Sequence, residues 1–191
     1  ERDLLPARPL KNGSAIQVHY GSARLAARLT LLDGCELLPG DRAIARLRCA
    51  RPIFVFIGDR FIIRDSSARQ TIAGGVVLNA AAEATRFRSA AERKFLQARA
   101  AAPNDLGILL RSQLRRDHVA QRGKLLLQSN FGAEEIDATI DCLAREKELF
   151  ASGAIVADAA WWEELRRRAV NAIDTEHKAH PERLGLGLSE F

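Results

Sequence analysis

The sequence predicts a multi-domain α and β protein in which an antiparallel β-barrel is followed by a winged helix-turn-helix domain. Residues 14–78 consist of short apolar runs separated by turn signals every 8–12 residues or so, about the spacing of a small antiparallel sandwich or barrel. Beyond residue 80 the apolar residues instead recur at helical spacing. We therefore expect a barrel over 1–80, a helical linker over 81–104, a winged helix domain over 105–158, and a connecting helix with the start of a second winged helix over 159–191.

The first segment has the alternation of β-strands. Residues 15–20 alternate in part, and the apolar residues of 23–32 share one strand face, namely Leu25, Ala27, Leu29 and Leu31. Turn signals follow at Asp33-Gly34, Pro39-Gly40-Asp41 and Gly58-Asp59. Further apolar runs cover 43–49, 53–57, 61–63 and 71–78. Several short strands without a helix to cover an open face favour closure of the sheet into a barrel.

The second segment has the pattern of helices closed by a hairpin. Residues 89–102 are rich in helix formers, and Pro103-Asn104-Asp105 ends that helix and caps the next one over 106–116. The remaining expected elements are a short helix over 121–128, an amphipathic helix over 133–147, a β-hairpin over 148–157 turning near Ser152-Gly153, and a last helix over 160–178. Three helices followed by a hairpin make a winged helix-turn-helix.

The composition is that of a globular protein whose positive charge lies in its first part. Of 191 residues, 47% are hydrophobic and 28% charged, and the formal net charge is +5. Residues 1–82 hold 12 Lys and Arg against 7 Asp and Glu, whereas residues 83–191 hold 17 of each. A basic excess favours binding to polyanions such as nucleic acid, although a charge of this size also serves solubility alone.

The sequence also predicts where the protein works. It has no apolar run long enough to span a membrane and no signal peptide. Its three cysteines are too few and scattered for a disulfide framework, so we expect reduced thiols and a cytoplasmic location. The chain contains no Met, even at position 1, which predicts an internal piece of a longer protein.

A catalytic site cannot be assembled from the sequence. There is no phosphate-binding Gly-x-x-x-x-Gly-Lys-Ser/Thr loop, and Gly74-Gly75 lies within a strand-like run, where a bulge or barrel corner is the better explanation. The histidines form no metal-binding pair; His177 and His180 lie near a helix end, where the helix dipole accounts for them. We therefore expect no catalytic residues, no metal and no cofactor in this chain.

Charged residues place the candidate nucleic-acid surface on the barrel. The helix over 133–147, which would enter the major groove in a DNA-binding winged helix, carries Glu134, Glu135, Asp137 and Asp141 before its first basic residue, Arg145. The barrel instead offers candidate RNA-binding arginines at Arg46, Arg48, Arg60, Arg64 and Arg69. Arg46 and Arg48 share one strand face, as do Arg60 and Arg64. Each could equally be a solvent-facing residue whose stem covers apolar surface.

Several motifs resemble one translation factor family. Residues 58–65 (Gly-Asp-Arg-Phe-Ile-Ile-Arg-Asp), 71–78 (Thr-Ile-Ala-Gly-Gly-Val-Val-Leu) and 18–24 (Val-His-Tyr-Gly-Ser-Ala-Arg), with Leu38-Pro39-Gly40, resemble the third domain of bacterial selenocysteine-specific elongation factors, which is similar to that of elongation factor Tu. Residues 180–186 look like the family's entry into a second winged helix. The sequence departs from the family pattern at Ala73, where a glycine is usual, and at Asn79-Ala80, where Asp-Pro is common.

The resemblance implies a fragment of a GTP-hydrolysing factor that delivers selenocysteinyl-tRNA to the ribosome at recoded UGA codons. It implies that the GTPase domain, with its GTP and Mg²⁺, lies upstream of Glu1, and that the winged helices that read the mRNA selenocysteine-insertion hairpin lie downstream of Phe191. The barrel would face the tRNA, and the first winged helix would act as a spacer. Two alternatives remain: a winged-helix DNA-binding regulator with a β effector domain, and a purely structural spacer between domains.

Overall fold

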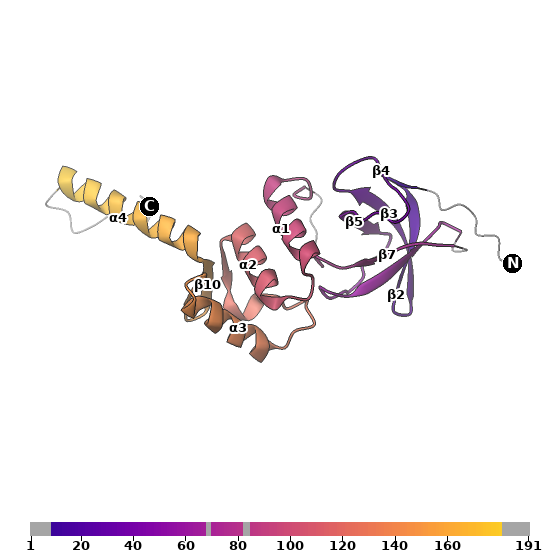
Figure 1. Ribbon diagram of the computed structural model, residues 1–191. Coiled ribbons are helices and arrows are strands. Elements are labelled where there is room, and N and C mark those ends of the chain that lie inside the picture. Colours follow the sequence, from indigo (N-terminus) through magenta and orange to yellow (C-terminus); the bar gives the residue numbers. More distant parts are fainter. Residues whose placement is uncertain (1–8, 68–69, 82–84, 181–191) are drawn as a thin grey trace.

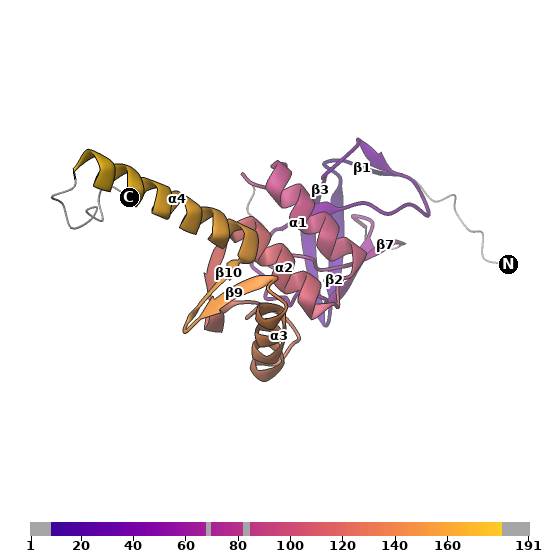
Figure 2. The same cartoon turned by 60° about the vertical axis from the view of Figure 1, so that its left-hand side comes forward.

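The computed structural model describes residues 9–67, 70–81 and 85–180 and forms an elongated molecule. A curled sheet lies at one end, helices α1 (Ala90–Ala101), α2 (Leu106–Asp117) and α3 (Ala133–Arg145) lie in the middle, and helix α4 (Ala159–Ala179) projects from the other end (Figures 1 and 2). This arrangement confirms the predicted fold class, a β-barrel-like domain followed by a winged helix.

An antiparallel five-stranded sheet in the order β5-β3-β2-β6-β7 forms the first domain. Its strands are β2 (Ala15–Tyr20), β3 (Ala23–Leu31), β5 (Ala45–Cys49), β6 (Arg60–Arg64) and β7 (Thr71–Val76); β1 (Leu10–Lys11) and β4 (Glu36–Leu37) pair separately. The predicted alternation in β3 is confirmed, because its apolar side chains are buried in a core that also contains Ile16, Val18 and Ile63. Gly75 lies against this core, where an added Cβ would overlap the ring of Phe61.

The predicted strand over 53–57 is wrong. Among the described residues, β5 and β7 remain the two edges of the sheet, and a cavity of about 530 Å³ lies between them, lined by Ile53, Val55 and side chains of the sheet core. The segment leaves the sheet because its end is fixed elsewhere. The backbone N–H of Ile57 donates to the carbonyl of Gln128 at 2.7 Å, and Ile57 pairs with Ser129 in the winged helix domain.

Asp59 fixes the same segment from the barrel side. Its carboxylate accepts hydrogen bonds from the Tyr20 hydroxyl, from the Phe56 backbone N–H at 2.8 Å and from the Asn130 side chain at 3.3 Å. Burial alone would raise the pKa of Asp59, but these hydrogen bonds outweigh it and hold the pKa below its usual range. Asp59 therefore joins strand β2, the turn before β6 and the winged helix domain.

The winged helix domain follows its sequence signals closely, with one exception. Ser89 caps α1, and Asp105 caps α2 as the sequence predicts, by accepting from the Ile108 N–H at 2.8 Å. Strands β9 (Leu149–Ser152) and β10 (Ile155–Asp158) form the predicted hairpin, with Gly153 at φ +55° in the turn. The short helix expected over 121–128 is wrong: β8 (Val119–Gln121) joins the hairpin, and only a 3₁₀ turn, η1 (Arg122–Lys124), follows.

A single apolar core holds this domain together, and it includes one residue from the barrel segment. Helices α2 and α3 and the hairpin contribute Leu109, Leu110, Ile140 and Val156, all fully buried, and Ile57 is buried among them at 7% exposure. The separation into barrel and winged helix that the sequence suggests is therefore crossed by at least one core side chain.

Helix α4 contacts the rest of the molecule through its first turns. Trp161 stacks on His118 and Trp162 on Phe150, with ring centroids 5.5 Å and 4.1 Å apart. Further along, Val170 is 56% exposed. The predicted start of a second winged helix falls in 181–191, outside the described residues. None of the helices in the described part of the chain combines the length and apolar character needed to cross a membrane.

Candidate nucleic-acid interface

The outer face of the five-stranded sheet gathers arginines. Because side chains alternate along a strand, the residues between the buried positions of β3 point outward, and their partners on the neighbouring strands point outward with them. Arg48 on β5 lies opposite Arg28 on β3, and Arg64 on β6 lies opposite Gln17 on β2. We call this set the arginine face: Arg24, Arg28, Arg46, Arg48, Arg60 and Arg64.

The register sets the spacing of these cations. Strands in a sheet lie about 4.8 Å apart, and Arg28 and Arg64, on either side of β2, are offset by two residues along it, so their backbones are about 12 Å apart. Along one strand, Arg24 and Arg28 are separated by about 13 Å at about 3.3 Å per residue. The face is therefore a two-dimensional array of positive charge that covers four adjacent strands.

Most of these guanidinium groups are available to a ligand. Arg24, Arg28, Arg48 and Arg60 are exposed, and among the described residues they form no ion pair; Arg46 lies over the Phe87 ring at 5.7 Å.

The described acids of the barrel domain lie in its loops and in β4, off this face; Asp33, for example, pairs with Arg93 of α1. Like charges directly opposite each other on a sheet are destabilising, so the Arg28–Arg48 pair carries a cost that a bound anion would relieve.

The structure brings together four of the five sequence-predicted residues: Arg46, Arg48, Arg60 and Arg64 share the arginine face. Arg69 lies outside the described residues. Sequence reasoning missed Arg24 and Arg28, although the signal was present, since both have the parity opposite to the buried residues of β3.

The centre of the face lacks the features of a base-reading or catalytic site. His19 and Ile62 lie opposite each other there; Ile62 is 49% exposed, and His19 Nε2 is buried without a hydrogen-bond partner in the described structure. Tyr20 and Phe61 have the inward parity and line the cavity instead. Over the residues that the structure describes, no group of His, Cys, Asp and Glu is arranged to hold a metal ion. The arrangement is suited to neutralising phosphates rather than to stacking bases.

The winged helix domain presents the opposite arrangement. Arg122 donates to Asp137 at 2.6 Å and forms an ion pair with Asp141 at 2.8 Å, so it neutralises acids of α3. These hydrogen bonds raise the pKa of Arg122. Glu134 and Glu135 remain at the N-terminal end of α3, where a groove-reading helix offers donors to bases and phosphates. The structure therefore gives the DNA-binding alternative no support.

Comparisons with known proteins agree with the sequence motifs. Residues 2–84 match the family described as selenocysteine-specific elongation factor, beta-barrel domain. The chain is 30% identical over 196 residues to a selenocysteine-specific elongation factor from Desulfomicrobium baculatum and 24% identical over 188 residues to one from Haemophilus influenzae. These alignments cover 96% and 98% of this chain but 29% of each relative, so the chain spans less than a third of their length.

A solved structure shares the fold. The crystal structure of bacterial selenocysteine-specific elongation factor EF-Sec matches 96% of this chain and 27% of its own, with a TM-score of 0.54 and 16% sequence identity. The similarity extends across the curled sheet and the winged helix in the same order.

Proposed function

Because the chain belongs to the family of selenocysteine-specific elongation factors, we propose that its barrel domain binds selenocysteinyl-tRNA through the arginine face during delivery to the ribosome at recoded UGA codons. The observation that carries the proposal is the group of four exposed arginines on the outer face of the sheet, Arg24, Arg28, Arg48 and Arg60, which form no ion pair among the described residues. Phosphate neutralisation by such an array releases counterions and provides affinity without reading sequence.

The same face favours folded RNA over an unstructured strand. Proteins that hold single strands interleave cations with aromatic rings on which bases stack. The rings of Tyr20 and Phe61 lie on the inner side of the sheet, so neither is presented beside the arginines of the outer face. A tRNA presents closely spaced phosphates in fixed positions, which suits a rigid array of guanidinium groups.

The remaining parts of the proposal lie outside this chain. GTP and Mg²⁺ belong to a GTPase domain of the whole factor, and the mRNA selenocysteine-insertion hairpin is bound by winged helices beyond residue 191. The first winged helix domain acts as a spacer between them, in the cytoplasm. Its paired arginines and acidic α3 support a role that does not need contact with RNA.

A salt titration tests the proposal. Binding of the chain to a selenocysteine tRNA transcript is followed by fluorescence anisotropy over a range of KCl concentrations. If three to five phosphates are neutralised, the slope of log K against log [salt] lies between about −2.7 and −4.5. We expect a single-stranded RNA of equal length to bind at least tenfold more weakly. A slope near zero, or equal binding of both RNAs, would refute the proposed interface.

A further inference from the structure

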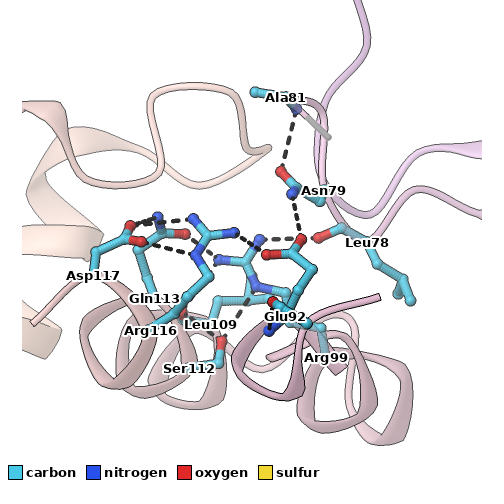
Figure 3. A network of polar contacts seen from close by, with 11 residues as sticks. Leu78, Asn79, Ala81, Glu92, Arg99, Leu109, Ser112, Gln113, Arg116 and Asp117 are labelled. Atoms are coloured by element: carbon cyan, nitrogen blue, oxygen red, sulfur yellow. Dashed lines mark hydrogen bonds and ion pairs between the residues drawn. The ribbon is translucent and has the colours of Figure 1, made fainter. Parts of the chain in front are cut away.

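A buried polar network lies where the barrel domain meets the helices (Figure 3). At its centre is Arg99 of α1, which has 0% exposure although arginine is seldom fully buried. The residues around it come from three elements: Leu78 and Asn79 at the exit from the sheet, Glu92 and Phe95 of α1, and the inner face of α2.

Arg99 bonds to all sides of this junction. Its Nη1 donates to the Leu78 carbonyl at 2.9 Å, on the barrel side. Its Nε donates to Ser112 Oγ at 3.2 Å and its Nη2 to Gln113 Oε1 at 2.7 Å, both on α2. One side chain therefore ties the barrel exit to α2 through α1, using several directional bonds from a planar group.

A second arginine completes the network. Arg116 of α2 pairs with Glu92 at 3.2 Å, and the other oxygen of Glu92 accepts from Asn79 at 3.2 Å. The Phe95 ring lies 4.0 Å from the guanidinium carbon of Arg99 and 3.9 Å from that of Arg116.

The charges of the network balance. Asp117 binds Arg116 at 2.8 Å, so the two cations, Arg99 and Arg116, lie near two carboxylates, those of Glu92 and Asp117. Burial, and then the charge of Arg116, lowers the pKa of Arg99 to about 9, which still leaves it protonated at neutral pH.

Two further contacts between the domains lie away from this network. Ile57 is buried in the winged helix core and its N–H bonds to Gln128, while Asn130 bonds to Asp59. Asp33 in the loop after β3 pairs with Arg93 of α1. Two domains joined at one point can rotate about that point as a hinge. Here the barrel domain contacts the helices at several separate places, so one domain cannot rotate relative to the other unless some of these contacts break.

The geometry points to a rigid joint: we infer that the barrel domain and the winged helix domain move as one body, locked by Arg99. A slight opening would leave the Arg99 guanidinium desolvated with only part of its hydrogen bonds, and a buried charge in that state is costly. Only complete separation would rehydrate it, and that would also expose Phe95 and Leu96. The direction of α4 relative to the arginine face is therefore fixed, so a ligand on the barrel and a partner at the end of α4 are held at a set distance.

The native cysteines allow a direct measurement. Cys35 is exposed in the barrel domain and Cys142 lies half-buried on α3, so spin labels at these sites report the distance between the two domains by pulsed electron paramagnetic resonance. Cys49 is replaced by Ser in all samples. We expect one narrow distance distribution for the full 191-residue chain, and a distribution at least twice as wide for Arg99→Met.

Arg115→Met is the matched control, because Arg115 is an exposed arginine on α2 without an ion pair among the described residues. Its distribution should equal that of the parent chain. If Arg99→Met fails to fold by circular dichroism, Asn79→Ala is measured instead and should also broaden the distribution, because it removes the bond from the barrel exit to Glu92 together with the local bond that Asn79 accepts from the Ala81 N–H. A broad distribution in the parent chain, or an unchanged width in the folded variant, would overturn the inference.

Discussion

The arginines of the barrel domain and those of the winged helix domain have different roles. On the outer face of the sheet, Arg24, Arg28, Arg48 and Arg60 point to solvent without a carboxylate partner in the described structure. In the helical part, ion pairs engage Arg111, Arg116, Arg122, Arg166 and Arg167. The same side chain is thus a candidate ligand-binding group in one domain and a structural group in the other.

This difference between the two domains depends on the positions of the acidic side chains. In the winged helix domain, carboxylates occupy the faces that arginines can reach, as Glu148 does for Arg111 at 2.7 Å. In the barrel domain the described acids lie in loops and in the small β1–β4 ladder, and none of them forms an ion pair with Arg24, Arg28, Arg48 or Arg60 in the described structure. A local excess of positive charge is therefore informative only once the partners of each cation are known.

Charge reversal should separate the two regions most strongly. We expect Arg24→Glu with Arg48→Glu to lower the affinity for selenocysteine tRNA by about 100-fold at moderate salt, because two phosphate contacts become repulsions. Anisotropy titrations at one salt concentration measure the change. Reversing two paired arginines of α4, with Arg166→Glu and Arg167→Glu, alters the net charge equally and should change the affinity much less. Equal losses would show that net charge alone determines binding.

The barrel segment should also prove essential to the stability of the winged helix. Ile57→Ala removes a buried side chain from the winged helix core and should lower the free energy of unfolding by about 2 kcal/mol. Urea unfolding followed by the fluorescence of Trp161 and Trp162, which stack on that domain, measures this loss. The control Ile62→Ala, at a 49% exposed position of the sheet, should cost about 0.5 kcal/mol or less. If both variants unfold alike, Ile57 is not part of the winged helix core.

Acid should weaken the joint between the two regions. Burial alone would raise the pKa of Asp117, but its bonds to Arg116 and Gln113 hold that pKa below the usual value, as hydrogen bonds do for Asp59. A carboxylate with a lower pKa in the folded state adds stability above its unfolded pKa, and this stability is lost as pH falls through the folded pKa.

We therefore expect the free energy of unfolding of the parent chain to fall between about pH 5 and pH 2, and Asp117→Asn to show a shallower decline. Urea titrations at a series of pH values give both curves. Parallel curves for the parent chain and the variant would contradict the assignment of the acid dependence to Asp117.

The smallest expected effect is a gain. Arg48→Thr removes one of two like charges that lie directly opposite each other on β5 and β3, so the barrel domain should become more stable by about 0.5 kcal/mol while the affinity for tRNA falls. Chemical denaturation and anisotropy on the same protein measure both changes. A loss of stability would indicate that the stem of Arg48 contributes packing that outweighs the repulsion.

Local sequence patterns were sufficient for most of the elements. The cap at Asp105, the amphipathic α3 and the turn at Gly153 all depend on residues a few positions apart, and each was predicted. Strand alternation likewise determines which arginines share a face, and it would have identified Arg24 and Arg28. The two errors, a strand over 53–57 and a helix over 121–128, concern adjoining segments in space, where backbone bonds between Ile57 and Gln128 replace the local preference of both.

The amino-acid sequence by itself determined the order of domains, the helix ends and the basic character of the barrel, because these follow from local periodicity and composition. Only the tertiary structure decided which cations are neutralised by acids far away in the sequence. The partners of Arg111, Arg116 and Arg122 lie 37, 24 and 15 residues away along the chain. The burial of Arg99 likewise depends on Leu78 and Gln113 meeting across two helices. The i,i+3 pairs of α4 and the contact of Arg116 with Asp117 follow from spacing in the chain. The long-range ion pairs and the desolvation of Arg99 are set by distance in space, and no spacing in the chain encodes them.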